Sequence, residues 1–311
     1  MSTPIEQFPP GGKVIPNRKK VLLADGVILL SALIWGGDYI FAKNLLETIT
    51  PGRLNALRFS VCAVILLFVA FKKLKQVPVR EIAGCLLTGF CMFGGFFFQT
   101  GGLRLTSIGN NAFIVSSYVI FVPFVLWMLQ RQRPGIGAFL SALVCVSGIA
   151  LLTLNRATKP NLGDVMTLIS AVCFAFEIVL IGIFARRVDP VVLAFLEACV
   201  VAVCFNIYAA FAEPPIPRLD GGMIGSLIYL TFLGATATHI MVTLAMKHTS
   251  SVHASIICSL ESVFGLLMAV LFLGETVQWK QAFGCVLVFL AVLFTELWDQ
   301  IVPAKTRTSS V

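Results

Sequence analysis

The chain contains two copies of one pattern of polar, aromatic and proline positions. A residue in the first copy has its counterpart 139 positions later, with no gap between the first matched position and the last. The matched pairs are Ser31 and Ser170, Trp35 and Phe174, Asp38 and Glu177, Pro51 and Pro190, and Arg58 and Glu197. The match resumes with an offset of 143, at which Leu103 corresponds to Met246, Asn110 to His253 and Tyr118 to Glu261. The four extra residues of the second copy are expected in loops. An internal repeat of this length constrains the fold more than any single motif does.

The composition places both copies in a membrane. Hydrophobic residues make up 58% of the chain and charged residues only 12%. A run of about 20 apolar residues is long enough to cross the hydrocarbon core, and in lipid such a run has to be a helix or part of a closed barrel. The runs here are too long and too uniformly apolar for barrel strands. The sequence therefore predicts an all-α integral membrane protein with ten transmembrane helices, near residues 22–46, 52–71, 81–103, 109–129, 135–154, 162–184, 191–211, 223–245, 252–273 and 279–298.

Each copy holds five of these helices. Because five is odd, the two copies are expected upside down relative to one another, which is the architecture of many transporters with midplane substrate sites. The predicted organisation is a first five-helix repeat over 22–155 and an inverted second repeat over 162–298. The remaining segments are a polar connector over 155–161 and cytoplasmic tails over 1–21 and 299–311.

The positive charges set the predicted orientation. Lys and Arg accumulate in short cytoplasmic loops, and roughly two thirds of the 23 in this chain fall on the side of the two termini. Residues 1–20 are polar, and the apolar run that follows has no site typical of signal-peptide cleavage. We expect both termini to be cytoplasmic in the inner (plasma) membrane, with the lipid bilayer as the surrounding partner. The net charge of +8 follows from this loop bias and does not indicate nucleic-acid binding.

Several chemistries have no support in the sequence. The nine cysteines fall inside predicted spans without a C-x-x-C pair or a histidine cluster, so we expect small hydrophobic residues and not a disulfide framework or metal site. There is no Walker A motif. We expect no cofactor, no catalytic residues and no ATP-driven pumping.

The order and spacing of short motifs resemble a known family over nearly the whole chain. The first half shows Trp35-Gly36, Pro51, Arg58-Phe59, Gln99-Thr100-Gly101-Gly102 and Asn110-Asn111, and the second half shows Ser259-Leu260-Glu261 and Phe264. These resemble the EamA-domain branch of the drug/metabolite transporter superfamily. The resemblance implies two inverted five-helix bundles that move small organic solutes, with export as the expected direction and alternating access as the mechanism. It does not identify the solute, because family members handle very different compounds.

Ionisable and polar residues inside the spans are the candidate functional residues, because a charge at the bilayer centre costs at least about 2.5 to 3.5 kcal/mol and persists mainly beside a cavity or partner. Glu261 and Tyr118 are predicted at mid-depth as repeat mates. Glu261 either binds a cationic group or a proton, or is a protonated acid bonded between helices. Gln99 and Asn111 either line an outer vestibule or satisfy helix ends. The predicted cavity residues are Trp35, Asp38, Gln99, Asn111, Tyr118 and Glu261.

A second group is predicted to act as a gate or in proton coupling. Asp38 and Arg58 are expected at similar depth in the outer third, where they form either a gate or a structural ion pair, unless Arg58 extends to the interface. Glu177 and Glu197 are expected together in the inner third, and two nearby carboxylates resist ionising together. They either carry a coupling proton, form the inner gate or extend toward Arg186 and Arg187. His239 is either a packing residue or a proton relay.

Two helix features and two other classes of function complete the predictions. Pro123 is expected to kink the fourth helix, while Ser262 stands where the family often has proline. The alternatives to a transporter are a membrane scaffold or receptor and an intramembrane enzyme. Protons are a candidate coupling ion, and a homodimer is left open.

Overall fold

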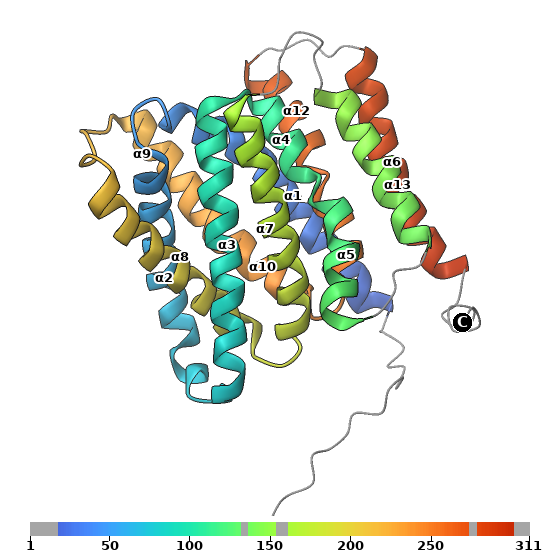
Figure 1. The fold of residues 1–311 in the computed structure, drawn as a ribbon, viewed down its shortest axis with the longest axis horizontal. Coiled ribbons are helices and arrows are strands. Elements are labelled where there is room, and N and C mark those ends of the chain that lie inside the picture. The colour runs from blue at the N-terminus through green and yellow to red at the C-terminus, as the bar shows by residue number, and fades with distance from the viewer. Residues whose placement is uncertain (1–17, 132–135, 154–160, 274–278, 302–311) are drawn as a thin grey trace, which may run out of the picture.

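The computed structural model describes residues 18–131, 136–153, 161–273 and 279–301, and these are helical with short turns and without strands. The predicted all-α class is confirmed. Figure 1 shows the helices, whose bounds are α1 Arg18–Leu45, α2 Pro51–Leu74, α3 Val79–Leu105, α4 Ile108–Ser116, α5 Tyr118–Gln130, α6 Ile136–Thr153, α7 Leu162–Phe184, α8 Pro190–Ala212, α9 Gly221–Ile228, the π-helix η1 Tyr229–Ala237, α10 Thr238–Ala245, α11 Ser251–Cys258, α12 Glu261–Leu273 and α13 Trp279–Ile301.

The helices group into the spans predicted from the sequence. Within the described residues, eight helical segments are long and apolar enough to cross a membrane, and α6 and α13 contain shorter apolar stretches, Phe139–Leu151 and Ala282–Phe294. Three spans are composite, since α4 with α5, α9 with η1 and α10, and α11 with α12 each form one crossing. Most of the connector 155–161, most of the tail 1–21 and the tail beyond 301 lie outside the described residues. The connection 213–220 is longer than its counterpart 75–78, as expected for the extra residues of the second repeat.

Two hydrogen-bonded contacts show that the repeats are inverted. We call the end of the bundle where α1 begins the proximal end and the end where α1 finishes the distal end. Lys43 Nζ, in the last turn of α1, donates to the carbonyl of Leu103 at 2.7 Å, at the end of α3. Thr106 Oγ1 then donates to Asp164 Oδ1 at 2.6 Å, in the first turn of α7. Because α7 begins where its repeat mate α1 ends, the two helices run in opposite directions.

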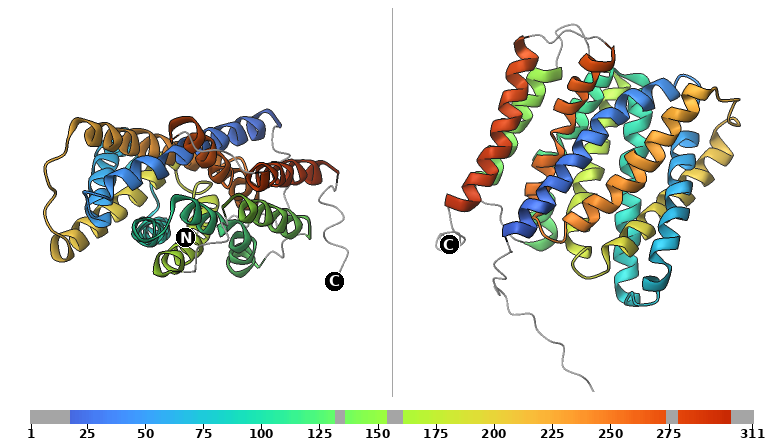
Figure 2. Two further views of the ribbon diagram at one scale, coloured as in Figure 1. Left: turned by 90° about the horizontal axis from the view of Figure 1, so that it is seen from above. Right: turned by 180° about the vertical axis from the view of Figure 1, so that it is seen from behind.

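Helix packing follows the same symmetry. The repeat mates α2 and α8 pack together at one edge of the bundle, and α6 packs with α13 at the other (Figures 1 and 2). Between these pairs, α3 packs on α7 just as α1 packs on η1 and α10. The bundle centre is therefore built from equivalent helices of both repeats, and a site there receives side chains from each.

Carboxylates fasten α2 to α8 at both ends. At the distal end, Glu213 accepts hydrogen bonds from Thr50 Oγ1 at 2.7 Å, Gly52 N at 3.0 Å and Arg53 N at 2.7 Å. These amides belong to the first turn of α2, which has no intrahelical partner for them. At the proximal end, Asp189 caps α8 by accepting from Val191 N, and Lys73 at the end of α2 reaches it at 2.8 Å.

Asp189 is expected to make the protein less stable in acid. Burial tends to raise the pKa of Asp189, but the hydrogen bonds from Lys73 and from the Val191 amide outweigh it and hold the pKa below the usual 3.8. A carboxyl group of this kind stabilises the fold above its unfolded pKa, and the stabilisation is lost as pH falls through the folded value. Since Lys73 and Asp189 are 46% and 35% exposed, we expect less than about 1 kcal/mol. Unfolding midpoints of wild type and Asp189→Asn should converge as pH falls below 3.8, whereas a constant difference down to the lowest pH would contradict this role.

Candidate solute cavity

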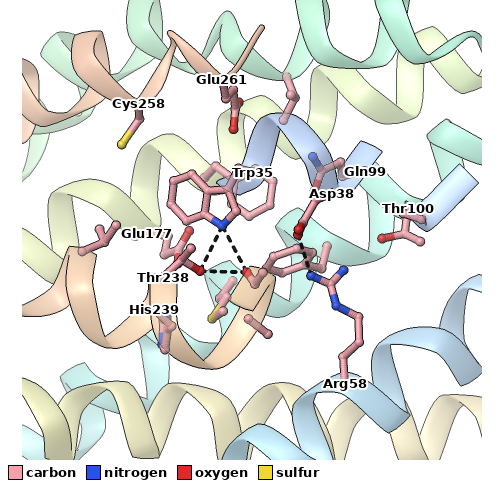
Figure 3. Close-up of a pocket in the computed structure, with 18 of the residues that line it drawn as sticks. Trp35, Asp38, Arg58, Gln99, Thr100, Glu177, Thr238, His239, Cys258 and Glu261 are labelled. Atoms are coloured by element: carbon pink, nitrogen blue, oxygen red, sulfur yellow. Dashed lines mark hydrogen bonds and ion pairs between the residues drawn. The ribbon is translucent and has the colours of Figure 1, made fainter. Parts of the chain in front are cut away.

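A cavity of about 110 Å³, measured as the volume open to the centre of a water-sized sphere, lies among helices of both repeats. A single water needs about 10–15 Å³ on this measure, so the cavity has room for several waters or a small organic group. Its walls are mostly apolar and aromatic, with a few ionisable groups. Figure 3 shows how these groups are placed: Asp38 and Arg58 come from the first repeat, and Glu177, His239 and Glu261 come from the second.

Trp35 is held at the centre of the cavity by the π-helix η1. A π-helix is rare and often marks a functional site. Trp35 Nε1 lies 3.1 Å from both the carbonyl oxygen of Gly234 and Oγ1 of Thr238, and donates to them (Figure 3). Thr238 Oγ1 itself donates to the Gly234 carbonyl at 2.7 Å. The predicted cavity residue Trp35 is thus connected directly to the eighth span.

Asp38 and Arg58 form an ion pair, which is one of the arrangements that the sequence allowed. Arg58 Nη2 lies 2.9 Å from Asp38 Oδ2, and the arginine side chain is only 3% exposed. Its guanidinium carbon lies 5.8 Å from the ring centre of Phe59 and 5.6 Å from that of Phe96, within cation–π range. Gly234 permits this arrangement, because a β-carbon there would collide with the Asp38 carboxylate. Both ions line the cavity and face apolar surroundings.

Two helix breaks occur at repeat-equivalent positions beside the cavity. The fourth span breaks at Ser117, just before Tyr118, and the ninth breaks at residues 259–260, just before Glu261. Ser117 Oγ donates to the Ile114 carbonyl at 2.5 Å and Ser259 Oγ donates to the Ile256 carbonyl at 2.6 Å. Serine hydroxyls that bond back to the preceding turn bend helices.

The positions of these breaks correct one expectation and answer another. A kink was expected at Pro123, but the fourth span is interrupted more than one turn earlier, and Pro123 lies inside the continuous helix α5. The ninth span breaks before the glutamate although Ser262 replaces the family's proline. Ser262 instead contacts Ser116 Oγ at 2.6 Å and donates to the carbonyl of Ala112 at 3.2 Å, which connects the two breaks.

Glu261 is the first residue of α12 and lines the cavity together with Tyr118. Its Oε1 accepts from Ser116 Oγ at 3.2 Å, and the residue is 7% exposed. A carboxylate at a helix N-terminus is favoured by the aligned peptide dipoles. Glu261 is therefore bonded to Ser116 of another helix and also lines the cavity, and its role in binding a cationic group or a proton stays a prediction.

Glu177, His239 and Glu197 meet in the proximal half of the bundle. Glu177 and His239 line the cavity. Glu197 does not; it is fully buried behind His239, with Oε2 at 2.8 Å from His239 Nε2. The two acids lie close enough for their charges to interact, as predicted. The contact between His239 and Glu197 was not predicted, because no signal in the sequence fixes how the eighth and seventh spans face one another.

Gln99 and Asn111, which were predicted together, differ in their position relative to the cavity. Gln99 lines the cavity, and its Nε2 lies 3.4 Å from Tyr39 Oη. Asn111 is fully buried outside the lining, where its Nδ2 donates to the Gln99 carbonyl at 3.1 Å and to Thr167 Oγ1 at 2.8 Å. Asn111 was predicted as a cavity residue and does not line this cavity; its two bonds join α4 to the interiors of α3 and α7 and do not satisfy a helix end. Two further lining residues, Tyr39 and Thr238, went unnoticed in the sequence, although Tyr39 directly follows Asp38.

Comparisons with known proteins agree with the repeat and the fold. The sequence model of the EamA-like transporter family matches residues 22–154 and again 161–297. An uncharacterized transporter of Archaeoglobus fulgidus is 29% identical over 281 residues, which cover 89% of this chain and 87% of that protein. An uncharacterized transporter of Synechocystis sp. is 23% identical over 312 residues, covering 92% and 94% of the two chains.

A solved crystal structure superposes on 92% of this chain and 99% of its own, with a TM-score of 0.76. Its sequence identity of 16% makes this a likeness of fold alone. The family match is stronger evidence than this likeness of fold, because it accounts for both halves of the chain separately. The chain therefore belongs to the EamA-like transporter family of the drug/metabolite transporter superfamily and is a multi-pass membrane transporter.

Proposed function

We propose that the protein exports small organic solutes across the inner (plasma) membrane by alternating access, with the described cavity as the solute site and both termini in the cytoplasm. The observation that carries this proposal is that one cavity receives ionisable side chains from both inverted repeats. Transporters built from inverted repeats place their substrate sites between the repeats and use discontinuous helices there. The breaks beside Tyr118 and Glu261 fit that pattern.

The lining indicates the kind of solute. Ligand sites usually combine apolar and aromatic walls with a few placed polar groups that fix orientation. Here the rings of Trp35, Tyr118 and Phe174 supply the apolar wall. Glu261 supplies a carboxylate, and among the described residues no Arg or Lys side chain forms a salt bridge with it. We assign Glu261 to a cationic group of the solute or to a proton.

The other classes of function are less well supported. The family is one of transporters and not of enzymes. A scaffold or receptor has no need for an ionised pair and further acids around an internal cavity, since each buried charge costs free energy. Protons are the coupling ion that we favour, because the cavity is lined by Glu177, His239 and Glu261, which are side chains of the kind that take up and release protons.

A screen followed by flux measurement tests the proposal. Purified protein is screened by thermal shift against metabolites and organic cations, and each compound that stabilises it is then followed across proteoliposome membranes. We expect Glu261→Gln to lower flux at least about tenfold, which corresponds to a loss of about 1.4 kcal/mol.

Glu47→Gln is the matched control, because Glu47 is an exposed acid in the distal turn after α1 and does not line the cavity. Equal flux in wild type and Glu261→Gln would remove Glu261 from the site. Compounds that bind but never cross the bilayer would contradict transport.

A further inference from the structure

The contact between Glu197 and His239 has the geometry of a proton site. Glu197 on α8 is completely buried, and His239 on α10 separates it from the cavity with Nε2 2.8 Å from Oε2. Despite this short distance, neither the ring nitrogen nor the two carboxylate oxygens take part in an aligned hydrogen bond within the described part of the chain.

A carboxylate in this position is costly unless something neutralises it. Burying a charge without a partner costs many kcal/mol, so a buried acid either pairs or takes up a proton. The Glu197 and His239 pair can meet this demand in two ways, as carboxylate with imidazolium or as carboxylic acid with neutral imidazole. Both forms hold the same single proton, on different atoms of two side chains in contact. Release of that proton leaves a carboxylate beside a neutral imidazole, which is the proton-free state of the pair.

The groups that face this pair from the packed helices are mainly acids and thiols. They are Glu177 on α7, which lines the cavity and interacts with the Glu197 charge, and Cys85 and Cys91 on α3, both of which lie in the field of Glu197. Cys85 also lies near Glu81 on the same helix, and Cys91 near Cys173 on α7. Arg58, a cation on the same cavity, is held by Asp38. Among the described residues, His239 is thus the basic group at this place.

We propose that Glu197 and His239 together bind the coupling proton, and that Glu177 is the group through which this proton reaches the cavity. The inference rests on the proposed transport function and gives that function a proton site separate from the solute carboxylate. Glu261 lies across Trp35 from His239 in the cavity (Figure 3). With Glu261 as the solute carboxylate, solute and proton bind to different acids and do not compete for one.

The structure also provides a link between the two sites. His239 directly follows Thr238, which with Gly234 accepts the hydrogen bonds of Trp35 Nε1. A change in the charge of His239 alters its attraction to Glu197 and hence the position of α10. The same short helix holds the indole at the centre of the solute cavity. Proton binding at His239 is in this way transmitted through the adjacent Thr238 to Trp35 in the aromatic wall.

Histidine NMR on the purified protein tests the proton site without any solute. The chain has three histidines, and selective isotope labelling with His239→Gln as the assignment variant identifies the His239 signal. His248 is exposed in the turn after α10 and is the internal reference. We expect the position of the His239 signal to respond reversibly to pH, because the pair takes up and releases a proton. Glu197→Gln should abolish or clearly alter that response, whereas the His248 signal should behave alike in the wild-type protein and the variant.

The opposite results are equally clear. If the wild-type His239 signal does not respond to pH, neither partner of the pair takes up a proton and the proposal is wrong. If Glu197→Gln leaves its titration unchanged, the proton is not shared. Should that variant fail to fold, Glu177→Gln decides the access route, because a slower proton exchange at His239 supports entry from the cavity and an unchanged rate overturns it. A protein that titrates as expected but moves no solute would contradict the transport proposal instead.

Discussion

Replacement of Asp38 by asparagine is expected to destabilise the protein by about 3 to 5 kcal/mol, because it leaves Arg58 as a buried cation without a counter-charge. The Arg58 side chain is 3% exposed and that of Asp38 is 15% exposed, so water screens the pair very little. Arg58 Nε already lacks a hydrogen-bond partner among the described residues, and the nearby rings of Phe59 and Phe96 offer only weak compensation. Unfolding in detergent, followed with a thiol-reactive dye on the buried cysteines, measures the loss.

A double variant separates burial of charge from loss of packing. Asp38→Leu combined with Arg58→Met removes both charges and retains apolar volume, and replacing a buried ion pair in this way is often neutral or stabilising. We therefore expect the double variant to recover most of the stability that Asp38→Asn loses. A double variant that is less stable than Asp38→Asn would show that the pair contributes through specific geometry and not through cancelled charge.

The second large effect is expected at Gly36, where α1 and α12 come into close contact. A β-carbon at Gly36 would lie 2.7 Å from Phe264 Cβ and 2.8 Å from Gly265 N, and a backbone atom cannot move aside as a side chain can. Gly36→Ala should therefore separate the helices and cost about 1 to 3 kcal/mol. Since Trp35 and Glu261 belong to these two helices, the same change should also weaken solute binding.

Gly26→Ala is the matched control on the same helix. A β-carbon at Gly26 meets no atom within 4 Å, and alanine is more favourable than glycine in a helix interior by about 0.5 to 1 kcal/mol. This variant should be as stable as wild type or slightly more stable. Comparable losses at Gly26 and Gly36 would indicate a general sensitivity of α1 to substitution and would contradict the close contact as the cause.

The position of a residue along its helix could be predicted from the sequence, and the direction in which its side chain points around the helix could not. The rise of about 1.5 Å per residue is fixed, so counting from Pro51 and from the repeat placed Asp38 beside Arg58, and the pair is present. The face of a helix is different. For a soluble helix an apolar stripe marks the buried side, but lipid is as apolar as a protein interior. Nothing in the pattern therefore showed that Gln99 turns to the cavity while Asn111 turns away from it.

The broken spans show the same limit in another form. Proline was the expected cause of a bend because it removes a backbone donor, yet the interruption lies at serines that bond back to the preceding turn. A serine does this only where the surrounding helices allow the turn to open, so its effect depends on packing. The contact of His239 with Glu197 depends in the same way on how α8 and α10 are rotated against one another.

The sequence by itself determined the membrane class, the duplicated five-helix unit and the level of Asp38 and Arg58 along their helices, since these follow from hydrophobic length and helix rise. The tertiary structure alone decided which side chains share a cavity, which acid faces a histidine and where the spans break. These depend on helix rotation and close approach, which uniformly apolar spans do not encode in their pattern.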